Sequence, residues 1–175
     1  LVQDLRAESM AILIGVNTAI RDNPSLTVRG RDIGPRDRPV RVVIDPNNRI
    51  LNDSNLMNDG LAPTLLVQIS EFDKTNDKEH VERVVISENK EIDILKILDM
   101  LGDRKIQSLL VEGGSNTWMR FLESGFVDKA HLCVSNMELS GESNEIFSKE
   151  YLLNSGLTKI RDIKISNDTV SLWKK

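Results

Sequence analysis

The chain has 175 residues, 23 Lys and Arg against 27 Asp and Glu, one Cys and a formal net charge of −4. This length fits one domain that buries its core without disulfides or metal, and the acidic balance argues against a nucleic-acid partner. One Cys excludes an internal disulfide and a Cys-based zinc cluster, so we expect no metal site. No apolar run approaches the roughly 20 residues of a membrane span. The charged first residues do not resemble a signal peptide, and we expect a cytoplasmic protein without a membrane partner.

Apolar runs along the chain predict strands that are separated by polar loops. Residues 1–10 are interpreted as the end of a helix, and the apolar run 11–16 as a strand covered on both faces. A turn is predicted at 21–24, because Asp and Asn side chains bond their own backbone and Pro24 disfavours a helix there. Further strands are predicted at residues 40–44, 64–69, 83–86, 106–111 and 130–134, with loops at 30–39 and 45–58.

Two segments of the C-terminal half show a helical pattern. Residues 92–101 carry an apolar stripe at helical spacing, with Gly102 as a C-terminal cap, and residues 115–124 form a helix that ends at Gly125. Residues 142–156 are interpreted as irregular, and residues 159–165 and 169–173 as a terminal hairpin. The sum is an α/β fold with a mixed, mostly parallel central sheet and an antiparallel C-terminal hairpin.

The first place that can carry chemistry is a strand that runs into two glycines and then a helix, at residues 111–117. Glycines let a backbone approach a ligand closely, and the helix start offers N–H groups and positive potential to a phosphate. A plain tight turn between strand and helix is the alternative. Glu112 either faces the ligand crevice at the strand's carboxyl end or simply stabilises the helix N-terminus.

The second place is the stretch of residues 15–29, which follows the carboxyl end of the predicted strand 11–16. It holds the hydroxyl of Thr18, the carboxylate of Asp22 and the guanidinium of Arg29 within twelve residues. The Arg29 guanidinium is able to bind a phosphate with two hydrogen bonds, and Arg6 in the preceding helix is a candidate to reach the same crevice. A surface loop with solvated charges is the alternative.

Three motifs follow one another in the chain: G-V-N-T-A-I-R-D-N-P-S-L-T-V-R at residues 15–29, P-V-R-V-V-I-D at 39–45 and L-L-V-E-G-G-S at 109–115. Together they resemble the reductase family of riboflavin biosynthesis, over residues 4–140. That family comprises the C-terminal domain of bacterial deaminase–reductases and the stand-alone archaeal and fungal reductases. The resemblance implies a dihydrofolate-reductase-like, three-layer fold.

The resemblance also implies roles for individual residues. The implied NADPH contacts are Thr18, Asp22, Gly114, Ser115, Asn116 and Thr117. The implied substrate contacts are Arg6, Leu26, Arg29 and Glu112. The group that protonates the substrate stays open: Asp22 and Glu112 are candidates, and bound water is their rival.

The implied reaction is the NADPH-dependent reduction of a ribosylaminopyrimidine 5′-phosphate to its ribityl form, by an enzyme that we expect to be a homodimer. The substrate is either the 2,5-diamino pyrimidinone or its deaminated counterpart. A dihydrofolate-reductase-like enzyme and a non-catalytic nucleotide-binding paralogue are the alternative functions.

Two features depart from the family pattern. Family members begin with a strand like S-L-D-G-K, whereas this chain opens in the helix that follows it, so we expect residues 1–175 to be a single reductase domain that lacks its N-terminal strand. Pro46 stands where bacterial members often carry a Ser that contacts the cofactor, and proline offers no hydrogen-bond donor. Arg49 is a candidate for the 2′-phosphate of NADPH, with a solvated loop arginine as the alternative. Cys133 lies in an apolar run and is expected to be buried.

Overall fold

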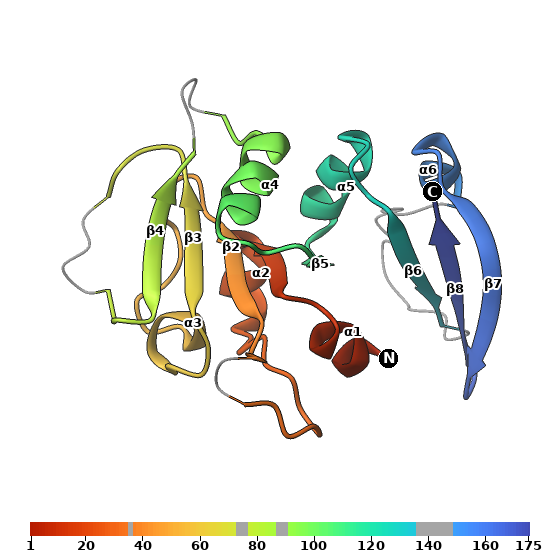
Figure 1. The fold of residues 1–175 in the computed structure, drawn as a ribbon, viewed down its shortest axis with the longest axis horizontal. Helices are drawn as coiled ribbons and strands as arrows, with labels where there is room; N and C mark the ends of the chain where they lie inside the picture. Colours follow the sequence, from red (N-terminus) through yellow and green to blue (C-terminus); the bar gives the residue numbers. More distant parts are fainter. Residues whose placement is uncertain (35–36, 73–76, 87–90, 136–148) are drawn as a thin grey trace. The chain divides into compact units, whose positions relative to one another are not determined.

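The computed structural model describes residues 1–34, 37–72, 77–86, 91–135 and 149–175. The chain divides into two compact units, Leu1–Trp118 and Met119–Lys175. Figure 1 shows the first unit in red to green and the second in blue-green to blue. That residues 1–175 form a single reductase domain without its N-terminal strand stays a prediction.

The first unit is built on a five-stranded sheet in which every pairing is parallel. Its strands are β1 (Ala11–Gly15), β2 (Val40–Ile44), β3 (Thr64–Gln68), β4 (Val81–Val85) and β5 (Leu109–Gly113), in the order β4-β3-β2-β1-β5. The three inner strands are buried almost throughout, as expected of continuous apolar runs covered on both faces. The predicted strands at the start and centre of the chain are therefore confirmed.

Among the described residues of the first unit, five helices begin: α1 (Val2–Ala7), α2 (Val16–Asp22), α3 (Asn55–Asn58), α4 (Ile94–Asp103) and α5 (Ser115–Glu123). Sequence reasoning did not foresee α2. Residues 16–22 form a helix because Val16 and Ala19 lie one turn apart and are both buried. The helix ends at Asn23, whose φ of 39° is left-handed, directly before Pro24. Helix α3 likewise lies inside the predicted loop 45–58.

A bulge interrupts the pairing of β1 with β5. Leu13 lies opposite Val111, but the next residue, Ile14, lies opposite Gly113. Glu112 is therefore the extra residue of β5 at this point. A bulge of this kind bends the strand and redirects a side chain, and here the redirected side chain is an acid.

The second unit contains β6 (Lys129–Val134), α6 (Lys149–Asn154), β7 (Thr158–Ile165) and β8 (Asp168–Lys174). Its three strands pair antiparallel in the order β6-β8-β7, which confirms the terminal hairpin. Residues 149–154 are helical rather than irregular, and residues 142–148 lie outside the described residues. Cys133 is exposed, not buried as expected, because it shares the outward face of β6 with Lys129 and His131.

The α/β class with a parallel central sheet and an antiparallel C-terminal end is thus confirmed. Among the described residues the strands form two separately hydrogen-bonded sheets, one of five strands and one of three.

Candidate active site

Two helices begin next to each other at the carboxyl ends of the neighbouring strands β1 and β5. A Cβ atom added to Gly15 would lie 2.5 Å from the Thr117 Oγ1 atom, and one added to Gly114 would lie 2.9 Å from the Thr18 Oγ1 atom. Gly114 also has a φ of 42°, which favours glycine. Glycine at both positions therefore lets the start of α2 approach the start of α5. In open α/β sheets, ligands bind at this edge.

The first turn of α5 brings four of the expected cofactor contacts together, namely Gly114, Ser115, Asn116 and Thr117. The Thr117 N–H is engaged with the Gly114 carbonyl at 2.9 Å. The N–H groups that open a helix have no partner within it, and together with the helix dipole they favour an anion. Thr18 of α2 brings a hydroxyl close to Gly114, 2.9 Å from where its Cβ atom would lie. A phosphate-bearing cofactor fits this arrangement of donors.

Arg6 and Glu112, both expected substrate contacts, bind each other. The Arg6 Nε–Glu112 Oε1 distance is 2.6 Å and the Nη2–Oε2 distance is 2.7 Å. The two side chains are 11% and 16% exposed, so each keeps an edge open to a ligand. The remaining Arg6 nitrogen, Nη1, donates to the Thr27 carbonyl at 2.8 Å. The pair thus ties α1 and the bulge of β5 to the segment that follows α2.

That segment, residues 23–29, carries the two other expected substrate contacts. Leu26 has a φ of 46° and is only 3% exposed, so its side chain belongs to the core rather than to an open surface. Arg29 lies near the surface, and its backbone N–H donates to the Gln3 Oε1 atom at 2.6 Å. Within the described part of the chain, the Arg29 guanidinium has no ion-pair partner, which leaves it available to an anionic group.

Asp22, an expected cofactor contact and candidate acid, lies on the exposed last turn of α2. Its Oδ1 atom accepts a hydrogen bond from Arg21 Nε at 2.7 Å. This bond from the guanidinium lowers the pKa of the Asp22 carboxyl below its usual value. Asp22 is therefore ionised at neutral pH and is poorly suited to donate a proton. Both Glu112 carboxylate oxygens accept hydrogen bonds from Arg6.

The loop after β2 contributes a contact that the motifs did not predict. The buried Asp45 carboxylate accepts hydrogen bonds from the backbone N–H groups of Arg49 at 2.7 Å and Ile50 at 2.9 Å. This folds the loop so that Arg49 Nη1 donates to Asn17 Oδ1, at 2.8 Å, on the first turn of α2. The sequence signal that could have indicated this contact is Asp45 itself, an acid directly after the buried strand β2. Arg49 therefore lies beside the residue that precedes Thr18.

The described ranges contain neither a metal-holding cluster nor a membrane-spanning helix. No group of three or more His, Cys, Asp or Glu side chains there is placed to hold a metal ion. None of the helices described is long and apolar enough to cross a membrane.

Comparisons with known proteins show which family the chain resembles. Residues 1–172 match the RibD C-terminal domain family. The chain is 34% identical to the 2,5-diamino-6-ribosylamino-4(3H)-pyrimidinone 5′-phosphate reductase of Methanothermobacter thermautotrophicus, over 80% of this chain and 65% of that protein. It is 33% identical to the riboflavin biosynthesis protein RibD of Aquifex aeolicus, over 98% of this chain and 48% of that protein. The chain thus spans about half to two thirds of these relatives.

A solved structure shows the same fold. The deaminase/5-amino-6-(5-phosphoribosylamino)uracil reductase of Thermotoga maritima has a TM-score of 0.77 at 22% identity, covering 99% of this chain and 47% of that one. The family match extends over nearly the whole chain, and the two relatives are matched at about one third identity. The chain therefore belongs to the RibD C-terminal domain family.

Proposed function

We propose that this chain catalyses the NADPH-dependent reduction of a ribosylaminopyrimidine 5′-phosphate to its ribityl form. The observation that carries the proposal is the convergence of the Arg6–Glu112 ion pair with the paired starts of α2 and α5 on neighbouring strands. One side of this edge offers donors to a cofactor, and the other offers a positive group and a carboxylate to a substrate. The names of the curated relatives support the same reaction.

The cofactor would be held by Thr18, by Asp22 and by residues 114–117. The close approach of Thr18 to Gly114, where a Cβ atom would lie 2.9 Å from the hydroxyl, supports this, because it brings the Thr18 hydroxyl next to the start of α5. When bound, NADPH supplies a hydride from its nicotinamide ring. The chain's own part is to bind the cofactor and the substrate, to orient them toward each other and to exclude water from the site.

In the proposed reaction the substrate's ribose ring opens to a C1=N imine. Reduction would add a hydride to C1 and a proton to the nitrogen, which gives the ribitylamino group. In this proposal Arg29 binds the 5′-phosphate, and the lack of an ion-pair partner for its guanidinium among the described residues supports this role. Glu112 orients the substrate by accepting hydrogen bonds. Since Asp22 is ionised, bound water is the better candidate for the proton donor.

The test is turnover with two defined substrates. Purified protein is mixed with NADPH and either the 2,5-diamino pyrimidinone or its deaminated uracil counterpart, and the loss of reduced nicotinamide absorbance is followed. Mass spectrometry should show a product two hydrogens heavier than its substrate. Turnover of dihydrofolate instead would favour a folate reductase. NADPH binding without any turnover would favour a non-catalytic paralogue.

We also propose that the active form is a cytoplasmic homodimer. Support comes from the large apolar side chains exposed on the second unit, among them Ile160, Ile163 and Ile165 of β7, since surfaces of this kind often mark interfaces. Light scattering on the eluted protein measures the mass directly, and a monomer at working concentration would reject the dimer.

A further inference from the structure

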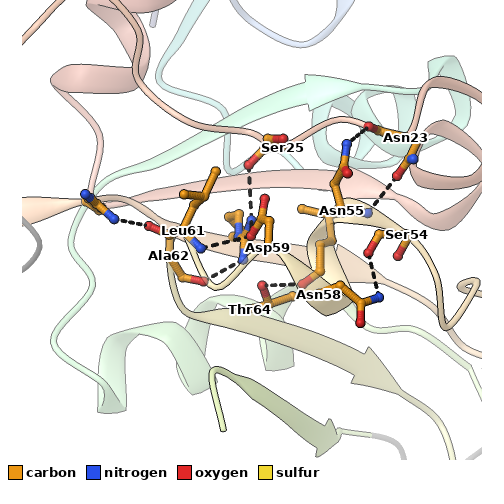
Figure 2. Close-up of polar contacts among 12 residues, drawn as sticks. Asn23, Ser25, Ser54, Asn55, Asn58, Asp59, Leu61, Ala62 and Thr64 are labelled. Atoms are coloured by element: carbon orange, nitrogen blue, oxygen red, sulfur yellow. Dashed lines mark hydrogen bonds and ion pairs between the residues drawn. The ribbon is translucent and has the colours of Figure 1, made fainter. Parts of the chain in front are cut away.

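A buried arginine on β2 lies outside the groups assigned to cofactor or substrate. Arg41 is the charged residue of an otherwise apolar strand, and its side chain has no exposed surface. Its Nη1 atom donates to Asp59 Oδ1 at 2.7 Å and to the Ser25 carbonyl at 3.2 Å, and its Nη2 atom donates to the Ala62 carbonyl at 2.6 Å. Figure 2 shows Ser25, Asp59 and Ala62 converging on one point. One guanidinium thus joins β2 to two other stretches of the chain, at Ser25 and at residues 59–62.

Stability alone is a poor explanation for this group. Burying an ion pair removes two charges from water, and apolar side chains of similar volume often serve as well or better. The Arg41 Nε atom and the Asp59 Oδ2 atom are both buried without a hydrogen-bond partner in the described structure. The buried Arg41–Asp59 pair is better explained by the backbone conformation that it fixes in the neighbouring segment of the chain.

The conformation in question is that of residues 23–29. This segment has no regular secondary structure, and both Asn23 and Leu26 have left-handed backbones, with φ values of 39° and 46°. Such a backbone is unusual for a bulky residue such as leucine, and it persists only where the surroundings hold it. The segment therefore needs external attachment points.

The attachments come from both sides of Leu26. Arg41 holds the Ser25 carbonyl before it, and Arg6 holds the Thr27 carbonyl after it. At the start of the segment, Asn55 of α3 donates its backbone N–H to Asn23 Oδ1 at 2.8 Å and its side-chain Nδ2 to the Asn23 carbonyl at 2.7 Å. Figure 2 shows both bonds as dashed lines.

We propose that Arg41 is a positioning residue: together with Asn55 it fixes residues 23–29 in the conformation that presents Arg29 and the Thr27 carbonyl to the substrate side of the site. Arg41 does not touch the substrate in this proposal. It acts through the Ser25 carbonyl, and its loss would release the segment from one side while Arg6 still held the other. The catalytic part of this inference rests on the proposed function.

The main test is a double variant, Arg41→Met with Asp59→Asn, in the full-length protein. The amide oxygen introduced by Asp59→Asn would keep an acceptor for the Leu61 N–H, which now donates to Asp59 Oδ1 at 2.9 Å. The matched control is Arg83→Met with Asp77→Asn, which removes another buried pair, joined at 2.6 and 2.8 Å with side chains 4% and 9% exposed. Arg83 makes no bond to residues 23–29 in the described structure.

Two readouts separate positioning from folding. Hydrogen exchange at the amides of residues 23–29 should accelerate at least about tenfold in the Arg41/Asp59 variant and stay unchanged in the control. The KM for the pyrimidine substrate should rise about tenfold or more, while the Kd for NADPH stays within about twofold of the original. Equal exchange in the variant and the original protein, or an equal rise of KM in the control, would overturn the proposal.

Two further variants protect the test against simple unfolding. Asn55→Ala changes an exposed side chain and should leave folding intact, yet accelerate exchange in the same segment. Arg41→Lys keeps the charge beside Asp59 but lacks the planar guanidinium, so its KM should lie between the KM of the original protein and that of the Arg41/Asp59 variant. A KM equal to that of the original protein would contradict positioning by the planar guanidinium. If the unmodified protein turns over neither pyrimidine, the proposed function fails, and the exchange measurement still decides whether Arg41 fixes the segment.

Discussion

Arg6 and Glu112 stand 106 positions apart in the sequence and form a two-point ion pair, with Nε–Oε1 and Nη2–Oε2 distances of 2.6 and 2.7 Å. One partner comes from α1 and the other from the bulge in β5. Because the pair is mostly buried, it shapes the site and also stabilises the packing of α1. Substitutions here should therefore affect stability and activity together.

Glu112→Gln is expected to keep the shape of the site and lose its charge. It should lower kcat/KM at least about a hundredfold and destabilise the chain by about 1–3 kcal/mol, because Arg6 loses a charged partner in a poorly hydrated place. Urea unfolding and steady-state kinetics measure the two effects. In a double-mutant cycle with Arg6→Met, purely additive unfolding free energies would show that the pair does not couple.

Gly15→Ala is expected to destabilise the chain by about 1–3 kcal/mol, because the new Cβ atom would lie 2.5 Å from Thr117 Oγ1. Adding Thr117→Ala should restore most of the loss, since the Thr117 Cβ atom would remain at an ordinary 3.8 Å. Thermal unfolding of the single and double variants tests this. If the second change gives no recovery, steric crowding between the two helix starts is not the cause.

Arg49→Gln is expected to weaken NADPH about tenfold while leaving NADH binding unchanged, if Arg49 meets the 2′-phosphate. Its attachment to Asn17 holds the guanidinium at the start of α2, where Thr18 lies one residue further on. Arg104→Gln, which breaks an exposed pair with Glu82, is the matched control. Equal weakening of both cofactors would instead indicate a general role in the loop.

Asp162→Asn is expected to lower stability at neutral pH and to have little effect in acid. The Ser171 hydroxyl, which donates to Asp162 Oδ1 at 2.6 Å, lowers the pKa of this carboxyl, and Lys159 lowers it further. A lowered pKa stabilises the fold above the unfolded value of about 4, and this contribution disappears as pH falls through the folded pKa. The measurement is the urea midpoint of the original protein and of Asp162→Asn from acidic to neutral pH. A difference between the two midpoints that stays the same at every pH would contradict the prediction.

The sequence predicted the strands of the first unit well, because buried parallel strands leave continuous apolar runs such as residues 11–15. It did not predict α2, since Asn17 and Thr18 have modest helix propensity and the helix depends on the burial of Val16 and Ala19. It also missed the burial of Arg41, because a charged residue in a short strand gives no sign of which partners distant loops bring to it.

In the candidate site, too, the sequence predicted some features and missed others. The resemblance implied which residues contact the cofactor and the substrate, and these roles stay a prediction; the structure brings two of those residues, Thr18 and Gly114, close together. The motifs did not indicate that Arg6 and Glu112 would bind each other, because local patterns carry no information on pairs so far apart. The resemblance implies a substrate contact for Leu26, whereas the structure places its side chain in the core.

The bulge in β5 has a consequence for how such a site is acquired. Glu112 is the surplus residue between Val111 and Gly113, and the pairing of β1 resumes in step on either side of it. A one-residue insertion in an otherwise regular strand would introduce the acid without moving any apolar neighbour to the wrong face of the sheet. The bulge therefore lets the sheet keep its register around the carboxylate, so deletion of Glu112 should preserve the pairing of β1 with β5 while leaving Arg6 without its ion-pair partner.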